Sequence, residues 1–214
     1  MTDKLSLFNG ALRIVKERKL ASLTENREPR RLLDDAYGDG ATDGAVRFCL
    51  EQGQWSFGRR AVQIDYNPDI TPDFGYRYAF EIPSDMVKLV SLCSDAYYEI
   101  PLLRYVDEGD YWYCELQTIY AIFVSNGPTF GTDMSRWPQS FVDLVQARLA
   151  LEIAPCLTNG DRAMQWAEAA YKTALREARS ANAMRQPTKF LPPGSWTSSR
   201  TGRISSRNSR WDGS

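Results

Sequence analysis

Two amphipathic stretches in residues 138–184 constrain the fold of this chain most strongly. Pro138 suits the opening turn of a helix, where a missing N–H costs nothing. Apolar residues then recur at helical spacing as far as Ile153, and a Leu157-Thr158-Asn159-Gly160 link follows. We therefore expect two antiparallel helices joined at residues 157–160, with the rest of the chain leaning on them.

Each helix of this pair has a face suited to burial. The apolar positions of the first are Val142, Val145, Leu149 and Ile153. Pro155 removes an intrahelical bond and restricts the residue before it, which predicts an end or a kink there. The second helix is expected to open at Thr158 or Asn159. It carries a stripe of small residues, at Ala163, Ala167, Ala170, Ala174 and Ala181. Because small residues let a neighbouring helix approach closely, we interpret this stripe as a core seam.

The N-terminal quarter also shows helical periodicity. A helix is predicted over residues 6–20, with apolar residues on one side and basic residues on the other. Asn26 is a good N-cap for a second helix reaching Leu50. Three glycines interrupt its middle, at Gly38, Gly40 and Gly44. Each costs about 1 kcal/mol in a helix interior relative to alanine, so propensity alone puts a loop there.

An acidic cluster in the same stretch resembles a calcium loop only superficially. With Asp35 as the first ligand position, Tyr37 and Val46 occupy the third and twelfth, where carboxylates are required. We interpret the cluster as a solvated acidic face and expect no metal site.

Residues 55–136 change to the alternating pattern of β-strands. Strands are predicted at residues 76–82, 86–90, 97–105, 111–115 and 117–124, with a tight turn at Glu108-Gly109-Asp110. The predicted fold class is therefore α+β, because strands follow one helical segment and precede another. We expect a helical bundle from residues 1–54 and 137–184, and an inserted antiparallel β domain over 55–136.

Aromatic residues are frequent in this middle region. Trp55, Phe74, Tyr97 and Trp112 are examples. Such rings can stack on nucleic-acid bases, but few Lys or Arg are interleaved with them. We therefore assign them to core and subunit contacts.

The ionisable residues exclude several kinds of chemistry. The chain has no histidine, which removes the commonest general base and transition-metal ligand. Its four cysteines are far apart and are expected to be buried free thiols rather than zinc ligands or disulfides. No nucleophile or metal-ligand spacing is recognisable, so we expect no catalytic, cofactor or metal site and disfavour an enzyme.

Charge is unevenly distributed along the chain. The formal net charge is −1. Residues 185–214 contain six basic side chains against one acid, a charge of +5, so the remainder, with 20 basic and 26 acidic residues, carries −6. No apolar run approaches the roughly 20 residues that span a bilayer, and the N-terminus lacks the pattern of a secretory signal. We expect a protein without membrane contact that stays in the compartment where it is made.

The order of these pieces resembles the head-to-tail adaptor family of tailed bacteriophages, of the tail tubular protein A type found in short-tailed phages. The N-terminal motifs are Asn9-Gly10-Ala11-Leu12-Arg13, Ala21-Ser22-Leu23-Thr24-Glu25, Arg31-Leu32-Leu33-Asp34-Asp35-Ala36-Tyr37 and Gln54-Trp55-Ser56-Phe57-Gly58. The later motifs are Phe74-Gly75-Tyr76-Arg77-Tyr78, Ile82-Pro83-Ser84-Asp85 and residues 141–150. The similarity covers residues 5–184, and partly on its account we keep the second helix continuous through Gly44.

The resemblance implies a structural protein of the virion, made in the host cytoplasm and placed at the head-tail junction. Family members form a ring, usually of twelve identical subunits, that docks beneath the capsid portal protein. The opposite face of the ring meets the tail or nozzle protein, and DNA passes through the lumen without specific binding. An acidic body suits such a channel, because negative charge lets the genome slide past.

The segment after Met184 differs in composition and lies beyond the resemblance. Leu191-Pro192-Pro193-Gly194 breaks any helix, and the following residues are rich in Ser and Arg. We predict an extended C-terminal arm over residues 185–214 that anchors in an acidic groove of the portal or of an adjacent subunit. The predicted contact residues are Trp196, Arg200, Arg203, Ile204, Arg207, Arg210 and Trp211. Arginine suits this role because its guanidinium forms forked contacts with carboxylates.

Two other interpretations of this segment remain open. A disordered tail that only confers solubility has the same composition. A nucleic-acid-binding protein acting through the basic arm is the alternative function, and it predicts a steep salt dependence of binding to random DNA.

Overall fold

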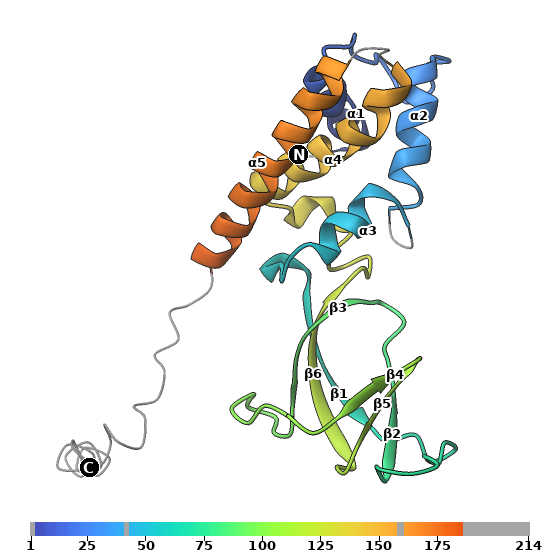
Figure 1. Cartoon of the computed structure of the whole chain (residues 1–214), viewed down its shortest axis with the longest axis vertical. Coiled ribbons are helices and arrows are strands. Elements are labelled where there is room, and N and C mark those ends of the chain that lie inside the picture. The colour runs from blue at the N-terminus through green and yellow to red at the C-terminus, as the bar shows by residue number, and fades with distance from the viewer. Residues whose placement is uncertain (1–2, 41–42, 158–160, 186–214) are drawn as a thin grey trace, which may run out of the picture.

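The computed structural model describes residues 3–40, 43–157 and 161–185, and within them the chain has an α+β fold. The helices are α1 (Lys4–Ile14), α2 (Glu28–Tyr37), α3 (Gly44–Glu51), α4 (Gln139–Leu157) and α5 (Asp161–Met184). The strands are β1 (Arg59–Asp65), β2 (Tyr78–Glu81), β3 (Met86–Cys93), β4 (Val106–Glu108), β5 (Tyr111–Cys114) and β6 (Thr118–Ser125). Helices gather at one end of the molecule and strands at the other (Figure 1).

Helix α4 lies at the centre of the helical part and contacts each of the four other helices. Its buried residues lie on several sides of the helix, as expected for a helix covered all round. Helix α5 packs along it through small residues, with Ala163, Ala167 and Ala178 buried. The predicted helix pair is therefore confirmed, but the alanine seam only in part: Ala163 and Ala167 are buried, whereas Ala170, Ala174 and Ala181 are partly exposed. Residues 158–160, where the second helix was expected to open, lie outside the described residues.

Pro155 does not end α4, which continues to Leu157. Proline has no N–H to donate to a carbonyl group in the preceding turn. Because few carbonyl groups in the last turn of a helix have an intrahelical donor in any case, losing one bond there does not stop the helix. A helix end at Pro155 was thus wrong by two residues, and a kink there stays a prediction.

Helix α1 is shorter than predicted and stops at Ile14 instead of Leu20. Lys16 has a left-handed backbone with φ 62°, and the N–H of Glu17 then donates to the carbonyl of Leu12 at 2.9 Å. This reversal returns Leu20 to the core, where it is 3% exposed. Burial of the Leu20 side chain is therefore favoured over a longer α1.

The predicted continuous helix from Asn26 to Leu50 is wrong. Helix α2 ends at Tyr37 and α3 begins at Gly44, and Gly38, Gly40 and Gly44 all have positive φ. A Cβ atom at Gly44, where φ is 80°, would overlap the carbonyl oxygen of Tyr37. Propensity thus predicted this break correctly, whereas the family resemblance did not. Asn26 is not the N-cap either, because that position belongs to Arg27.

The strands form two three-stranded antiparallel sheets, in the orders β1-β6-β3 and β2-β5-β4. Strands were predicted at the positions of β2, β3, β5 and β6, and the turn at Glu108-Gly109-Asp110 joins β4 to β5. The strand predicted over residues 97–105 is wrong. That segment is irregular and touches the sheet through one isolated bridge, between Cys93 and Pro101.

Aromatic packing joins the helical part to the sheets. The Phe141 ring on α4 lies 4.8 Å from that of Phe57 and 5.1 Å from those of Trp55 and Trp137, measured between centroids. Asn182 of α5 adds polar contacts, accepting from the N–H of Ser56 at 2.8 Å. The two ends of the molecule have separate hydrophobic clusters, and the sheet cluster centres on Phe80, Trp112 and Phe123. The proposed domain boundaries remain a prediction.

Candidate interaction surfaces

The predicted arm residues lie outside the described part of the chain, which ends at Arg185 directly after α5. This holds for Trp196, Arg200, Arg203, Ile204, Arg207, Arg210 and Trp211. Three surfaces within the described residues remain as candidates, one on the helices and two on the strand region.

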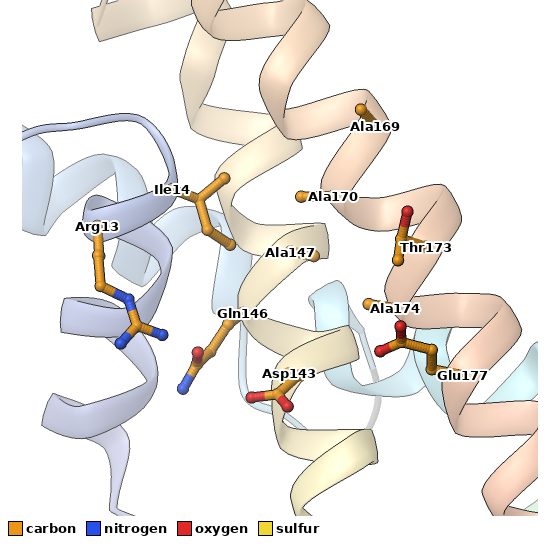
Figure 2. Close-up of a pocket in the computed structure, with 10 residues that line it drawn as sticks. All are labelled: Arg13, Ile14, Asp143, Gln146, Ala147, Ala169, Ala170, Thr173, Ala174 and Glu177. Carbon is orange, nitrogen blue, oxygen red and sulfur yellow. The ribbon is translucent and has the colours of Figure 1, made fainter.

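The helical surface is an open groove of about 410 Å³ between α1, α4 and α5. We call it the helical groove, and Figure 2 shows the residues that line it. They are Arg13, Ile14, Asp143, Gln146, Ala147, Ala169, Ala170, Thr173, Ala174 and Glu177. Alanines form much of its lining, so the backbones of α4 and α5 lie close beneath any segment that occupies it.

Charged groups rim this groove. The carboxylates of Asp143 and Glu177 lie towards the same end of the groove, and Arg13 projects from α1 on the opposite wall (Figure 2). Asp143 accepts a hydrogen bond from Gln139 at 2.8 Å. Among the described residues Glu177 has no ion-pair partner. The groove thus presents two carboxylates and one guanidinium.

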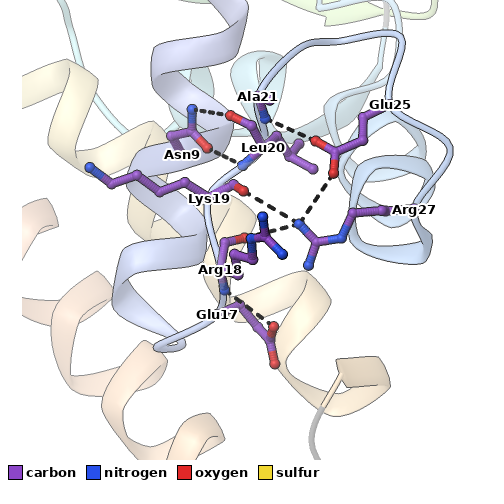
Figure 3. A network of polar contacts seen from close by, with 8 residues as sticks. All are labelled: Asn9, Glu17, Arg18, Lys19, Leu20, Ala21, Glu25 and Arg27. Atoms are coloured by element: carbon purple, nitrogen blue, oxygen red, sulfur yellow. Dashed lines mark hydrogen bonds and ion pairs between the residues drawn. The ribbon is translucent and has the colours of Figure 1, made fainter.

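A polar network holds the segment after α1 against that helix. Asn9 accepts from the N–H of Leu20 at 2.7 Å and donates to its carbonyl at 3.2 Å (Figure 3). Glu25 accepts from the N–H of Ala21 at 2.9 Å, and Arg27 donates to the carbonyl of Lys19 at 3.4 Å. This network fixes residues 15–25 against α1, so Asn9 and Glu25 of the quoted motifs have structural roles.

The adjacent motif residue, Gly10, allows α1 to approach α4. Gln146 of α4 is 8% exposed, and its amide lies where a side chain at residue 10 would be. A glycine at this position therefore lets the amide of Gln146 fit between the two helices.

The first surface on the strand region is a set of exposed apolar side chains on one segment. Tyr97, Ile100 and Leu103 are 85%, 60% and 86% exposed, and all three lie in the segment between β3 and β4. We call them the ridge. Soluble proteins rarely expose large apolar groups together unless a partner covers them.

A single carboxylate shapes the backbone beneath the ridge. Asp95 accepts from the N–H groups of Tyr97 and Glu99, each at 3.1 Å, and from that of Ile100 at 2.8 Å. These bonds, the Ile100 bond foremost, hold the pKa of Asp95 below its usual value. Tyr98 has a left-handed backbone with φ 59° within the same turn. The ridge is thus held in a defined conformation rather than left as an unconstrained loop.

The second surface on the strand region is a pocket of about 270 Å³, which we call the β-tip pocket. Its lining consists of Thr71, Pro72, Asp73, Phe74, Gly75, Tyr76, Val106, Glu108 and Tyr113. The Phe74 side chain is 90% exposed at this site. The pocket therefore combines apolar surface with two carboxylates, those of Asp73 and Glu108.

The aromatic residues of the middle region divide into two groups. Trp55 and Trp112 are buried, which confirms their assignment to the core. Phe74 and Tyr97 are exposed and are thus available to a partner. The sequence held one signal that separates them, since Phe74 stands between Asp73 and Gly75, residue types that favour turns.

Within the described residues no group of histidine, cysteine and carboxylate side chains is arranged to hold a metal ion. Three cysteines are buried, but Cys156 is exposed, so the expectation of four buried thiols was wrong for Cys156. Burial raises the pKa of the Cys49 thiol well above its usual value, which keeps it protonated and unreactive. None of the helices in the described ranges has the length and hydropathy that a membrane crossing requires.

Comparison with protein-family models and with curated proteins found no match to this chain.

Proposed function

We propose that this chain is a structural protein of a bacteriophage virion, a head-to-tail adaptor that forms a ring beneath the capsid portal. The ring links the portal to the tail or nozzle protein and surrounds a channel for the genome. Twelve identical subunits are the expected number.

The observation that carries this proposal is the ordered set of adaptor-like motifs. Several of their residues have defined positions in the fold: Asn9 fixes the segment after α1, Gly10 lies against α4, and Trp55 and Phe141 meet at the junction with the sheets. The chain thus uses the motifs to build one scaffold. Exposed apolar groups at the ridge and the β-tip pocket further support an assembled state.

The proposal includes a finer architecture than an α+β fold. Residues 1–54 and 137–184 form the helical bundle that faces the portal and the neighbouring subunits, and residues 55–136 form the inserted β domain. Residues 185–214 form the extended arm. The body charge of −6 suits a wall along which DNA slides.

The arm anchors the ring through its arginines, in an acidic groove of the portal or of the next subunit. The helical groove supports the second of these receptors, because Asp143 and Glu177 offer carboxylates at one end of it. Trp196, Ile204 and Trp211 then fill apolar sites nearby. A segment that becomes ordered on binding can cover a large surface in this way.

Docking on purified portal rings tests the proposal. The full chain should co-sediment with portal rings, whereas a chain truncated before Arg185 should remain in the supernatant. Changing Arg200, Arg203, Arg207 and Arg210 to Gln should weaken docking strongly. The matched change to Lys keeps the charge but loses the forked geometry, and we expect it to dock with intermediate strength.

Two results would count against the proposal in different ways. Unchanged docking of the truncated chain would remove the arm as the anchor. Absence of docking by the full chain would contradict the adaptor function itself.

The charge of +5 on residues 185–214 favours the alternative function, nucleic-acid binding through the arm. That function predicts tight binding of the isolated protein to random DNA, with affinity falling steeply as salt rises. The adaptor proposal predicts weak binding, because the acidic body repels the phosphates.

A further inference from the structure

The two exposed apolar surfaces of the strand region differ in shape. The ridge protrudes with Tyr97, Ile100 and Leu103, whereas the β-tip pocket is hollow beside Phe74. A protrusion and a hollow suit each other better than either suits a second copy of itself. Both surfaces are apolar, and their shapes differ in a complementary way. They are therefore suited to contact each other.

The segments that carry the ridge and Phe74 leave the sheets on opposite sides (Figure 1). In Figure 1 the green segment between β3 and β4, which carries the ridge, leaves the sheets on one side. The teal segment between β1 and β2, which carries Phe74, leaves them on the other. The two segments therefore extend from the sheets in different directions (Figure 1). A contact between different surfaces of successive copies is heterologous, and it closes into a ring when the rotation per subunit permits.

Charged residues also favour contact between the ridge and the β-tip pocket. Arg104 follows the ridge directly, and the β-tip pocket carries Asp73 and Glu108. None of these three side chains has an ion-pair partner among the described residues. A basic group beside the protrusion and acidic groups in the hollow favour ridge-to-pocket contact and disfavour pocket-to-pocket contact.

Preorganisation of the ridge also favours a binding role. The three backbone bonds to Asp95 fix the turn that projects Tyr97 and Ile100. The carbonyl of Ile100 in turn accepts from the N–H of Ser94 at 3.1 Å. A segment already held in its bound shape loses little conformational freedom on association.

We propose that the ridge of one copy of this chain inserts into the β-tip pocket of the next copy, with Arg104 facing Asp73 and Glu108. The occupant of the pocket is thus a second copy of the same chain. This inference rests on the proposed function only for the closure of successive contacts into a ring. The contact between two copies follows from the surfaces themselves.

Complementation between two variants of the full chain tests the contact. The ridge variant carries Tyr97→Ser and Leu103→Ser, and the pocket variant carries Phe74→Ser and Val106→Ser. Wild-type chain should self-associate in sedimentation velocity, and each variant alone should associate about tenfold or more weakly, as expected for loss of buried anchors. An equal mixture should form 1:1 dimers, because one intact ridge meets one intact pocket.

A control and a charge reversal sharpen this test. Met184 is 83% exposed on α5 and belongs to neither surface, so Met184→Ser should associate like wild type. Arg104→Glu should weaken association, and mixing it with Asp73→Arg, Glu108→Arg chains should restore a contact. Circular dichroism of every variant checks that the fold is retained.

Cross-linking identifies the surfaces that meet. In a Cys156→Ser background, chains with Leu103→Cys should form disulfides with chains carrying Phe74→Cys, in preference to either homodimer. A predominant Leu103→Cys homodimer would overturn the inference in favour of a symmetric contact. Monomeric wild-type chain, or self-association of the pocket variant at wild-type strength, would overturn it too.

The outcomes separate this inference from the proposed function. Self-association through ridge and pocket without portal docking would contradict the adaptor role alone. Rings that dock on portals but are unaffected by the ridge and pocket variants would contradict this contact alone.

Discussion

The absence of a Cβ atom at Gly44 allows α3 to begin at this residue. The residue combines φ 80° with close approach to the carbonyl oxygen of Tyr37. Gly109 has a similar φ of 62° but no neighbour near its missing Cβ atom. Substitutions at Gly44 and Gly109 therefore separate the free-energy cost of backbone strain from that of steric overlap.

We predict that Gly44→Ala destabilises the protein by about 2–4 kcal/mol, since strain and overlap both oppose the folded state. Gly109→Ala should cost only about 1 kcal/mol, because strain acts alone there. Urea denaturation of both variants measures the difference. Equal losses would show that the approach to Tyr37 imposes no constraint.

Asp95 gives the ridge a pH dependence with a defined sign. Because its pKa in the folded chain lies below the unfolded value, its contribution is complete above the unfolded pKa, about 3.9 for an aspartate. It is lost as the pH falls through the lower folded pKa. We predict that the amide signals of Tyr97, Glu99 and Ile100 shift together as the pH falls below about 3.9 in an NMR titration.

Asp95→Asn is the control for this titration, because its amide does not ionise. Its Tyr97, Glu99 and Ile100 signals should not follow a common low-pH transition. A wild-type titration that matches the variant would mean that Asp95 does not hold the turn.

At the scale of elements, the contact between Asn9 and Leu20 determines where α1 ends. The amide of Asn9 pairs with both the N–H and the carbonyl of Leu20, 11 residues away. We predict that Asn9→Ala destabilises the protein by about 1–3 kcal/mol, because it leaves those two groups unpaired. Asn9→Asp keeps the acceptor and should cost less. Thermal unfolding ranks the two variants, and an equal effect would argue against the pairing.

Elements governed by local pattern were predictable from the sequence, and those governed by distant contacts were not. Periodicity along 139–157 and 161–184 was sufficient for α4 and α5, and alternation was sufficient for β2, β5 and β6. The end of α1 depends on Asn9, which no local rule connects to Leu20. Residues 97–105 have strand-like composition, but the carboxylate of Asp95 captures the amides that a strand would use.

The candidate surfaces were predictable only in part. Basic composition predicts a C-terminal arm, and that prediction falls outside the described residues. Sequence reasoning missed the ridge and the β-tip pocket, because it assigned all the aromatic residues to core and subunit contacts without separating the two. Exposure of Phe74 and Tyr97 depends on the loops that carry them, and periodicity does not report on loops.

At the scale of the whole molecule, the proposed assembly uses two different contacts. The ridge and the β-tip pocket join copies side by side, and the arm joins the ring to the portal. In this proposal the acidic body lines the path of the genome. Such a division of roles is consistent with a chain of net charge −1 that carries +5 on residues 185–214 and −6 on the remainder.

Negative-stain imaging of the full chain mixed with portal rings tests the central claim most directly. We predict closed rings of the chain stacked coaxially beneath the portal, leaving an open central channel. Portal rings that stay bare, with the chain present as free monomers, would contradict the account.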